Sequence, residues 1–461
     1  MSADPGGPRA APAVPGTVAS RVPGLLWPAL PGRASLAVLA LHDQLARSQW
    51  WPAGRLEEMQ LRQLMALVGH AFRTVPHYRR ILPAKGRADR AFLRSLPVLT
   101  RAAVQEDPAA LVSERVPESH GAAGAVRSSG STGRPIEVKA THLSGLFRRA
   151  LYLRDHQWGA RDFTLAAASI RNFKDGSGMP PEGKRIAGWG FGYATRPLAA
   201  LNIRATIEQQ LAWLARVRPA YLSTFPTNLR ALAEEALARG IALPGLRQVS
   251  TYAESLPPGL RELARRAFGA SIADIYSSEE TGPIALQCPE HEHYHVQSEN
   301  LIVEVLDGEG RPCVPGETGR VIVTDLHNFA APLIRYELGD FAEAGPPCPC
   351  GRGLPVLQRI LGRERNMLRL PNGGSRWPTL PSGDELGRIA PVRQFQLVQK
   401  SLRELELRLV TARPLAPGEE EAVRRAFLAD LAQRFELRVA YADAIPRSAS
   451  GKYEDFRSEV P

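Results

Sequence analysis

Cysteine is scarce in this chain, whose 461 residues include only Cys288, Cys313, Cys348 and Cys350. A small secreted domain held together by disulfides carries a denser set, so that class is excluded. No apolar run approaches the ~20 residues with which a helix crosses a bilayer. The first residues, MSADPGGPRAAPAVPG, lack the charged start and apolar stretch of a signal peptide, and we expect a disordered tail over 1–22. These absences indicate a cytoplasmic protein with no membrane span.

Dense stretches of lysine and arginine are also missing, although the formal net charge is +11. The basic residues are mostly arginines spread along helical stretches, a pattern typical of a solvated basic surface. The same charge suits anionic small molecules such as nucleotides. Because no nucleic-acid recognition motif accompanies it, we expect no nucleic-acid partner. The sequence leaves the oligomeric state open between monomer and homodimer.

Hydrophobic residues make up 44% of the chain and follow two different periods. They recur at helical spacing in residues 57–75, 207–217 and 260–268. The short apolar runs 301–306 and 320–325 are typical of strands. Strands mixed with helices predict an α/β fold, with a large multi-sheet N-terminal domain over residues 23–362.

The pattern changes after a short stretch at 363–366, where we expect a hinge. Alternation of Leu405, Leu407 and Leu409 with charged residues predicts a half-buried strand. Other runs predict a strand before it, then a helix and a final strand. This β-β-α-β order predicts a small mobile α+β domain over residues 367–461.

A loop rich in serine and glycine, RSSGSTGRP, occupies residues 127–135. Glycines let backbone N–H groups approach phosphate oxygens, and hydroxyls donate further hydrogen bonds, so the loop suits an anion. It lacks the Walker pattern, and composition alone also fits a flexible linker. The residues expected to bind phosphate are Ser128, Ser129, Gly130, Ser131, Thr132, Gly133 and Arg134.

Six segments resemble, in the right order, the motifs of the adenylate-forming superfamily of acyl-CoA synthetases, peptide-synthetase adenylation domains and luciferase. The segments are RSSGSTGRP (127–135), TYAES (251–255), YSSEETG (276–282), PLIRYELGD (332–340), LGRERNM (361–367) and PRSASGK (446–452). The chain more closely resembles the phenylacetate–CoA ligase family, near its capsular-polysaccharide-associated branch. The resemblance covers residues 57–461 and implies the two-domain fold of that superfamily.

The resemblance implies that five of these segments, the phosphate loop among them, carry residues that bind ATP. Tyr276 would stack on adenine, with Glu254 in the segment on the adenine side. Asp340 would accept hydrogen bonds from both ribose hydroxyls, which requires a side chain rich in acceptors. Arg363 would approach the ribose or the phosphates near the hinge. Without the motif, Asp340 after glycine would be a turn residue.

Two further residues are implied to act on the reacting groups. Glu280 would hold the Mg²⁺ that bridges the ATP phosphates, because a hard cation prefers carboxylate oxygen. Lys452 would bridge the carboxylate and α-phosphate oxygens during attack. Without the motifs, Glu280 beside Glu279 would be a surface acidic pair and Lys452 a tail residue. The chain departs from the family at Ser277, where glycine is usual, and at Arg365 in the hinge.

The family places the acid pocket near YLSTFPTNL (221–229), which makes Phe225 and Tyr252 its expected walls. Both could equally be ordinary core aromatics. The segment 170–193, rich in glycine, aromatic and basic residues, is either a mobile lid or a long surface loop. No feature of the sequence identifies the acid.

Cysteine and histidine recur in a spacing that suits a metal. Cys288 and His295 are followed by the knuckle Cys348-Pro-Cys350-Gly, and three thiolates with one imidazole make a closed tetrahedral Zn²⁺ site. Relatives in the resembled family carry such a site. The alternatives are reduced cysteines without metal, or His293 in place of His295 as the ligand. A closed site would be structural.

Together these features predict an acid–thiol ligase that uses ATP and Mg²⁺. It would convert a carboxylic acid to an acyl-adenylate, release pyrophosphate, and then pass the acyl group to a thiol with release of AMP. The expected thiol is coenzyme A. Transfer to a carrier protein or an amine, and a non-catalytic role in polysaccharide biosynthesis, remain alternatives.

Overall fold

The computed structural model describes most of the chain. The described residues are Arg21, Leu25, 30–82, 89–127, 136–190, 192–363, 366–378, 380–381, 383–429, 431, 435–447 and 453–460. The expected tail over 1–22 lies almost wholly outside them. So do Lys452, Arg365 and the phosphate loop from Ser128 to Arg134.

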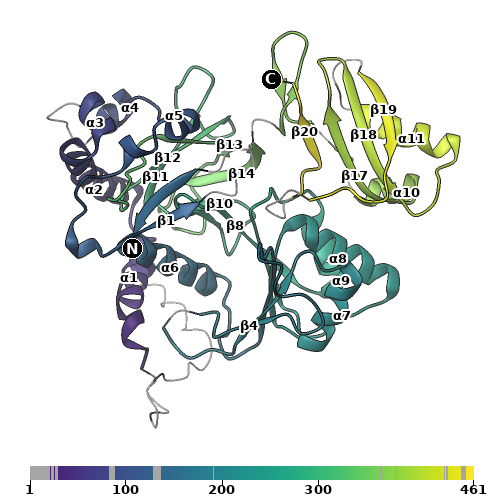
Figure 1. Ribbon diagram of the computed structural model, residues 1–461, viewed down its shortest axis with the longest axis horizontal. Helices are drawn as coiled ribbons and strands as arrows, with labels where there is room; N and C mark the ends of the chain where they lie inside the picture. The colour runs from purple at the N-terminus through teal and green to yellow at the C-terminus, as the bar shows by residue number, and fades with distance from the viewer. Residues whose placement is uncertain are drawn as a thin grey trace, which may run out of the picture.

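A twelve-stranded sheet runs through the large domain (Figure 1). Its strands, in spatial order, are β11 (Leu301–Leu306), β12 (Thr318–Asp325), β13 (Tyr336–Ala344), β14 (Val356–Arg363), β10 (Tyr294–Val296), β9 (Gly282–Gln287), β8 (Ser271–Ser278), β7 (Gln248–Tyr252), β6 (Tyr221–Thr224), β3 (Ala167–Arg171), β5 (Leu198–Asn202) and β4 (Lys184–Ile186). The strands β8, β7, β6, β3 and β5 are parallel, so their carboxyl ends share one edge of the sheet. The other pairs are antiparallel.

Helices cover both faces of the parallel strands. On one face lie α7 (Ile207–Val217), α8 (Pro226–Arg239) and α9 (Leu260–Phe268), which share a core with Ala168 and Ile170 of β3. Because side chains alternate along a strand, Ser169 and Arg171 face the opposite side. There α6 (His142–Trp158) packs on β9, and α1 (Leu36–Ser48) packs on α6.

The antiparallel part of the sheet carries the remaining N-terminal elements, with a core of its own. They are α2 (Ala53–Thr74), α3 (Pro76–Ile81), α4 (Arg90–Ser95), α5 (Arg101–Glu106), η2 (Ala109–Leu111) and η3 (Glu118–His120). The short η1 (Arg33–Ser35) precedes α1 and packs on it. A separate two-stranded ribbon, β1 (Ala123–Arg127) and β2 (Glu137–Thr141), flanks the phosphate loop on both sides. No helix in the described part of the chain is long and apolar enough to cross a membrane.

A small C-terminal domain with its own hydrophobic core lies beside α8 and α9 in Figure 1. It contains β15 (Leu368–Arg369), β16 (Ser375–Arg376), α10 (Gly383–Ile389), β17 (Val392–Gln399), β18 (Glu404–Thr411), α11 (Pro417–Leu428), β19 (Glu436–Tyr441) and β20 (Phe456–Ser458). The sheet order is β19-β18-β17-β20. The predicted β-β-α-β run corresponds to β17, β18, α11 and β19, and the sequence did not reveal α10 or β20.

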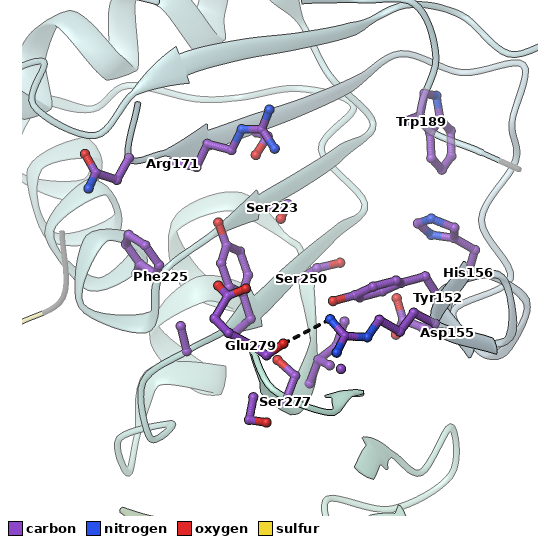
Figure 2. A pocket seen from close by; sticks show the side chains of 18 of the residues that line it. Tyr152, Asp155, His156, Arg171, Trp189, Ser223, Phe225, Ser250, Ser277 and Glu279 are labelled. Carbon is purple, nitrogen blue, oxygen red and sulfur yellow. Dashed lines mark hydrogen bonds between the residues drawn. The ribbon is translucent and has the colours of Figure 1, made fainter. Parts of the chain in front are cut away.

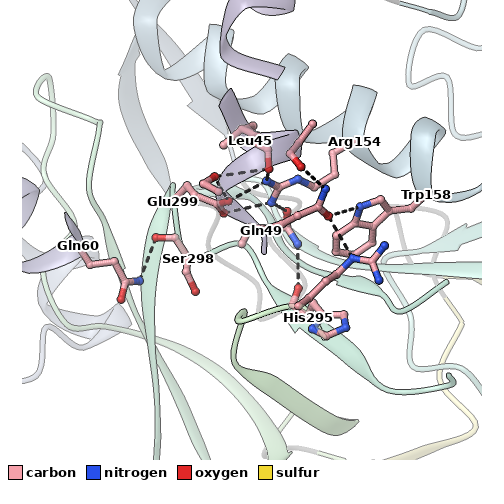
Figure 3. A network of polar contacts seen from close by, with 12 residues as sticks. Leu45, Gln49, Gln60, Arg154, Trp158, His295, Ser298 and Glu299 are labelled. Carbon is pink, nitrogen blue, oxygen red and sulfur yellow. Dashed lines mark hydrogen bonds and ion pairs between the residues drawn. The ribbon is translucent and has the colours of Figure 1, made fainter. Parts of the chain in front are cut away.

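A buried polar network joins α1, α6 and the segment after β10 (Figure 3). Arg154 is fully buried, donates to the Leu45 carbonyl and forms an ion pair with Glu299 at 2.8 Å. Burial alone would raise the pKa of Glu299, but the charge of Arg154 holds it below its ordinary value. Trp158 donates to Gln49 at 2.9 Å. The network fixes α6 against the sheet, because a buried charge that loses its partner is strongly destabilising.

Candidate active site

A cavity of about 850 Å³ runs between α6 and the sheet, along the face of the parallel strands from Ala167 and Tyr221 at their amino ends to Arg171 and Tyr252 at their carboxyl ends. Tyr152, Asp155 and His156 of α6 line it, and Ser223 and Ser250 line it from β6 and β7 (Figure 2). In open α/β sheets ligands bind at the edge formed by the carboxyl ends of the strands. That the cavity reaches this edge therefore follows from the strand topology.

Asp340 connects two of the expected ATP-binding residues. The hydroxyl of Tyr276 donates to its Oδ2 at 3.0 Å, and Nε of Arg363 lies 3.2 Å from its Oδ1. Asp340 and Arg363 are register partners on β13 and β14. Burial, followed by the charge of Asp340, raises the pKa of Tyr276 well above its ordinary value, so its hydroxyl stays a donor.

Glu280 lies buried in the cavity wall, whereas Glu279 beside it is exposed. The Oε1 atom of Glu280 is 3.4 Å from Nη1 of Arg101. Arg148 donates to the backbone carbonyls of Glu279 and Glu280 at 2.9 and 2.5 Å. Gly282 lets Arg148 approach, because a Cβ there would lie 2.7 Å from the Arg148 side chain. These contacts fix the turn that carries Glu280.

Glu254 holds the small domain against the large one. Its carboxylate accepts from the backbone and hydroxyl of Thr227 at 3.1 and 2.8 Å, and from the backbone N–H of Tyr453 at 2.8 Å. Arg447 also donates to the Thr227 hydroxyl at 2.9 Å. Burial raises the pKa of Glu254 in spite of these hydrogen bonds. Lys452, next to Tyr453 in sequence, lies outside the described residues.

A second cavity of about 260 Å³ separates the two domains at this point. Its lining combines Glu254, Tyr276 and Asp340 with Trp377 and Tyr453 of the small domain. Segments that lie far apart in the sequence thus meet around one space. The expected ATP-binding residues within the described chain are all at this space or at the larger cavity beside it.

Both expected pocket walls line the larger cavity. The rings of Phe225 and Tyr252 lie 5.2 Å apart, and burial raises the pKa of Tyr252 to about 12. The far wall comes from the 170–193 segment, whose Trp189 packs edge-on against His156 at 5.4 Å. Burial lowers the pKa of His156 to about 4, so this imidazole is neutral at pH 7.

Sequence reasoning did not find several cavity residues. Arg101, Arg148 and Arg171 line the cavity from elements without a motif, and one arginine in a helix or at a strand end gives no signal. Arg447, which contacts Thr227 and Glu254 where the two domains meet, could have been found, because it belongs to the PRSASGK segment. Thr227 lies only two residues after the expected wall Phe225.

The expected metal ligands converge in one buried cluster. The ligand atoms of Cys288, His295, Cys348 and Cys350 all lie within 4.8 Å of one another. The sulfurs of Cys288 and Cys348 are 3.9 Å apart, and Nε2 of His295 is 3.4 Å from the sulfur of Cys350. Nδ1 of His295 faces the Leu354 carbonyl at 3.4 Å, which leaves Nε2 directed at the sulfurs.

His293 is not part of this cluster, so His295 is the histidine that the fold brings to the cysteines. His295 also packs edge-on against Trp158 at 5.7 Å, next to the buried network of α6. The cluster joins the strands β9 and β10 to the segment between β13 and β14. It therefore ties the region after Glu280 to the region after Asp340.

Known proteins resemble the chain over most of its length. The phenylacetate-coenzyme A ligase of Thermus thermophilus is 27% identical over 392 residues, 79% of this chain and 83% of that protein. The enzyme of the same name from Escherichia coli K12 is 27% identical, covering 68% and 72%. These matches confirm the resemblance that the six segments indicated.

A solved structure of 2-hydroxyisobutyryl-CoA ligase in the postadenylation state, in complex with 2-HIB-AMP, shares the fold. Its TM-score is 0.70 at 19% identity, with 89% of this chain and 90% of that chain covered. The family model described as AMP-binding enzyme matches residues 87–330, more than half of the sequence. The chain thus belongs to the family of AMP-binding enzymes.

Proposed function

We propose that the chain is an acid–thiol ligase. It activates a carboxylic acid with ATP to an acyl-adenylate and passes the acyl group to coenzyme A, releasing pyrophosphate and then AMP. The observation that carries this proposal is the convergence of Tyr276, Asp340, Arg363 and Glu254 beside a cavity large enough for an acid. Four separate motifs supply these residues, and a flexible linker or a surface acidic pair would not bring them together.

The nucleotide occupies the space around Tyr276. The adenine stacks on this ring beside the backbone at Glu254, and the ribose hydroxyls donate to Asp340. Each oxygen of Asp340 already has one donor and keeps a lone pair for a further hydrogen bond. Arg363 lies where it can move from Asp340 to a ribose or phosphate oxygen.

The triphosphate lies at Glu280, and we expect the phosphate loop from Ser128 to Arg134, which is outside the described residues, to bind it as well. Arg127, just before that loop, lines the larger cavity, which supports this arrangement. Glu280 suits Mg²⁺, because its carboxylate is buried in the cavity wall and its Oε1 lies 3.4 Å from Nη1 of Arg101, a distance that leaves its oxygens able to bind a cation. When bound, the metal would neutralise charge on the phosphates.

Lys452 acts in the first half-reaction. The carboxylate oxygen attacks the α-phosphorus, the bond to the pyrophosphate oxygen breaks, and Lys452 stabilises the negative charge on both groups. Then the small domain turns about the hinge at 363–366, and the thiol attacks the mixed anhydride to release AMP. The contact of Tyr453 with Glu254 supports a position of Lys452 near the nucleotide in the first step.

We propose a structural Zn²⁺ in the cysteine cluster. Bonds of ~2.3 Å to sulfur and ~2.0 Å to nitrogen in a tetrahedron separate two sulfurs by ~3.8 Å and a sulfur from a nitrogen by ~3.5 Å. The distances of 3.9 Å and 3.4 Å fit that geometry. Four protein donors leave no open position, so the metal would stabilise the fold and take no part in the reaction.

Coenzyme A is the proposed acceptor because the matched relatives are named as coenzyme A ligases. The test is isotope exchange between pyrophosphate and ATP with a panel of aryl, fatty and polar acids in the absence of thiol. We expect exchange that depends on one class of acid, and AMP with acyl-CoA once coenzyme A is added. Exchange without any thioester would favour a carrier protein or amine acceptor. No exchange with any acid would favour a non-catalytic relative.

A further inference from the structure

The floor of the larger cavity is polar. Ser169, Ser223 and Ser250 are register partners across the neighbouring strands β3, β6 and β7, and all three line the cavity. Tyr252 lines the same part of the cavity beside Ser223. A pocket for a purely hydrocarbon acid is lined mostly by apolar side chains, because unmatched hydroxyls would lose their water without compensation. The floor instead suits an acid with polar groups.

The cations of the cavity fall into two groups. Most have a carboxylate partner: Arg161 pairs with Asp155, Arg101 with Glu280, Arg363 with Asp340 and Arg127 with Glu137. Arg148 and Lys174 also line the cavity without a carboxylate within 4 Å among the described residues, but Arg148 donates to the carbonyls of Glu279 and Glu280, and Lys174 is exposed. Arg171 likewise has no carboxylate within 4 Å in the part of the chain that the structure describes, and it is half-buried. Its guanidinium lies over the ring of Phe173, 4.9 Å from the centroid.

Arg171 lies far from the nucleotide end of the cavity. It ends β3, which is separated from β8 and Tyr276 by β6 and β7. Three strand spacings of ~4.8 Å place the two strand ends ~14 Å apart. Arg101 and Arg148, not Arg171, lie beside Glu280, where the triphosphate is expected. The charge of Arg171 therefore lies near the end of the bound acid that is farther from the carboxylate to be activated.

We propose that the acid carries a second oxyanion group, held by Arg171, at the end opposite the carboxylate that is activated. A half-buried guanidinium in a cavity binds an oxyanion by charge-assisted, paired hydrogen bonds. Ser169, Ser223 and Ser250 contact the part of the acid that lies between its two charged ends. This inference depends on the proposed function and specifies its substrate as a dianionic acid, either a dicarboxylate or a carboxylate with a phosphate-type end.

The experiment compares matched acids in pyrophosphate–ATP exchange. Each straight-chain dicarboxylic acid from succinic to suberic is set against the monocarboxylic acid of equal carbon number and against its ω-phosphono analogue. The variant is Arg171→Gln. Its matched control is Arg185→Gln, which removes one exposed arginine of β4 outside the cavity.

We expect the wild type to prefer a dianionic acid. Arg171→Gln should lower its kcat/KM for that acid about 10- to 100-fold, mainly through KM, the effect of losing one charged hydrogen bond. The monocarboxylate of equal length should be unaffected, and Arg185→Gln should match the wild type for both. Whether the dicarboxylate or the phosphono acid is preferred identifies the oxyanion. The fluorescence of Trp189 in the cavity wall gives acid binding without turnover and should show the same loss of affinity.

Three outcomes would overturn the inference while leaving the proposed function intact. They are a wild-type preference for monocarboxylates, an equal loss for both acid classes in Arg171→Gln, and a loss confined to the KM for ATP. Absence of exchange with every acid contradicts the proposed function itself, and with it this assignment of the substrate.

Discussion

The Tyr276 hydroxyl and the Asp340 carboxylate are 3.0 Å apart, although 64 positions separate them in sequence. The pair joins β8 to β13 at the end of the site where we expect the nucleotide. Nε of Arg363 contacts the other carboxylate oxygen of Asp340. The carboxylate of Asp340 thus positions both Tyr276, on which we expect adenine to stack, and Arg363 at the end of β14.

Asp340→Ala should weaken ATP binding by about 1.5–3 kcal/mol, because two ribose hydroxyls and two protein donors lose their acceptor. Calorimetric titration with ATP measures this directly. Asp340→Asn keeps one acceptor oxygen and should lie between the alanine variant and the wild type. Unchanged ATP affinity in a folded alanine variant would remove Asp340 from the ribose site.

Protein purified without chelator should contain close to one zinc per chain by elemental analysis. Cys348→Ser should lose the metal and lower the Tm, since a structural zinc contributes its binding energy to folding. Cys313→Ser is the matched control, because Cys313 is outside the cluster. Zinc-free wild-type protein with an unchanged Tm in Cys348→Ser would contradict the metal assignment.

Stability should depend on pH through Asp325, which is buried at the end of β12. Burial raises its pKa to about 6, against 3.8 ordinarily, although the His327 N–H donates to it. Folding therefore favours the neutral form. The stability that protonated Asp325 contributes to the folded state is complete below pH ~4 and is lost as the pH rises through ~6.

Asp325→Asn stays neutral, so at pH 7.5 it should be about 1–3 kcal/mol more stable than the wild type. The difference in the free energy of unfolding between the variant and the wild type should disappear by pH 4. Urea unfolding at several pH values would measure it. Asp307→Asn provides the contrast, since hydrogen bonds from Arg311 lower the pKa of this exposed carboxyl and no gain at high pH is expected. A difference that does not vary with pH would exclude titration of Asp325 as its cause.

The sequence predicted the elements whose signals are local. The alternation of Leu405, Leu407 and Leu409 is present in β18, and the helical period of residues 207–217 is α7. It did not predict that the strands of the large domain join into one sheet. Pairing such as Asp340 with Arg363 depends on tertiary contacts that no short pattern encodes.

The residues of the candidate site also fall into those that a local sequence pattern predicts and those that only the tertiary structure shows. Asp340 and Glu254 were found because motifs carry them, and Cys348 because its knuckle has metal-ligand spacing. Arg171 was missed because its importance depends on two tertiary features: it faces a cavity, and no carboxylate of the described residues lies within 4 Å of it. The hinge at 363–366 and the roles of the site residues stay predictions.

If Lys452 acts as proposed, its ammonium is needed only while the carboxylate attacks the α-phosphate. Lys452→Ala and the exposed control Lys400→Ala should be compared in two assays: pyrophosphate release from acid and ATP, and thioester formation from supplied acyl-adenylate. We predict that Lys452→Ala lowers the first by about 10²–10³, as the loss of one charge-stabilising donor does, and leaves the second near the wild-type rate. An equal fall of both half-reactions in a folded variant, or no fall in either, would contradict the account.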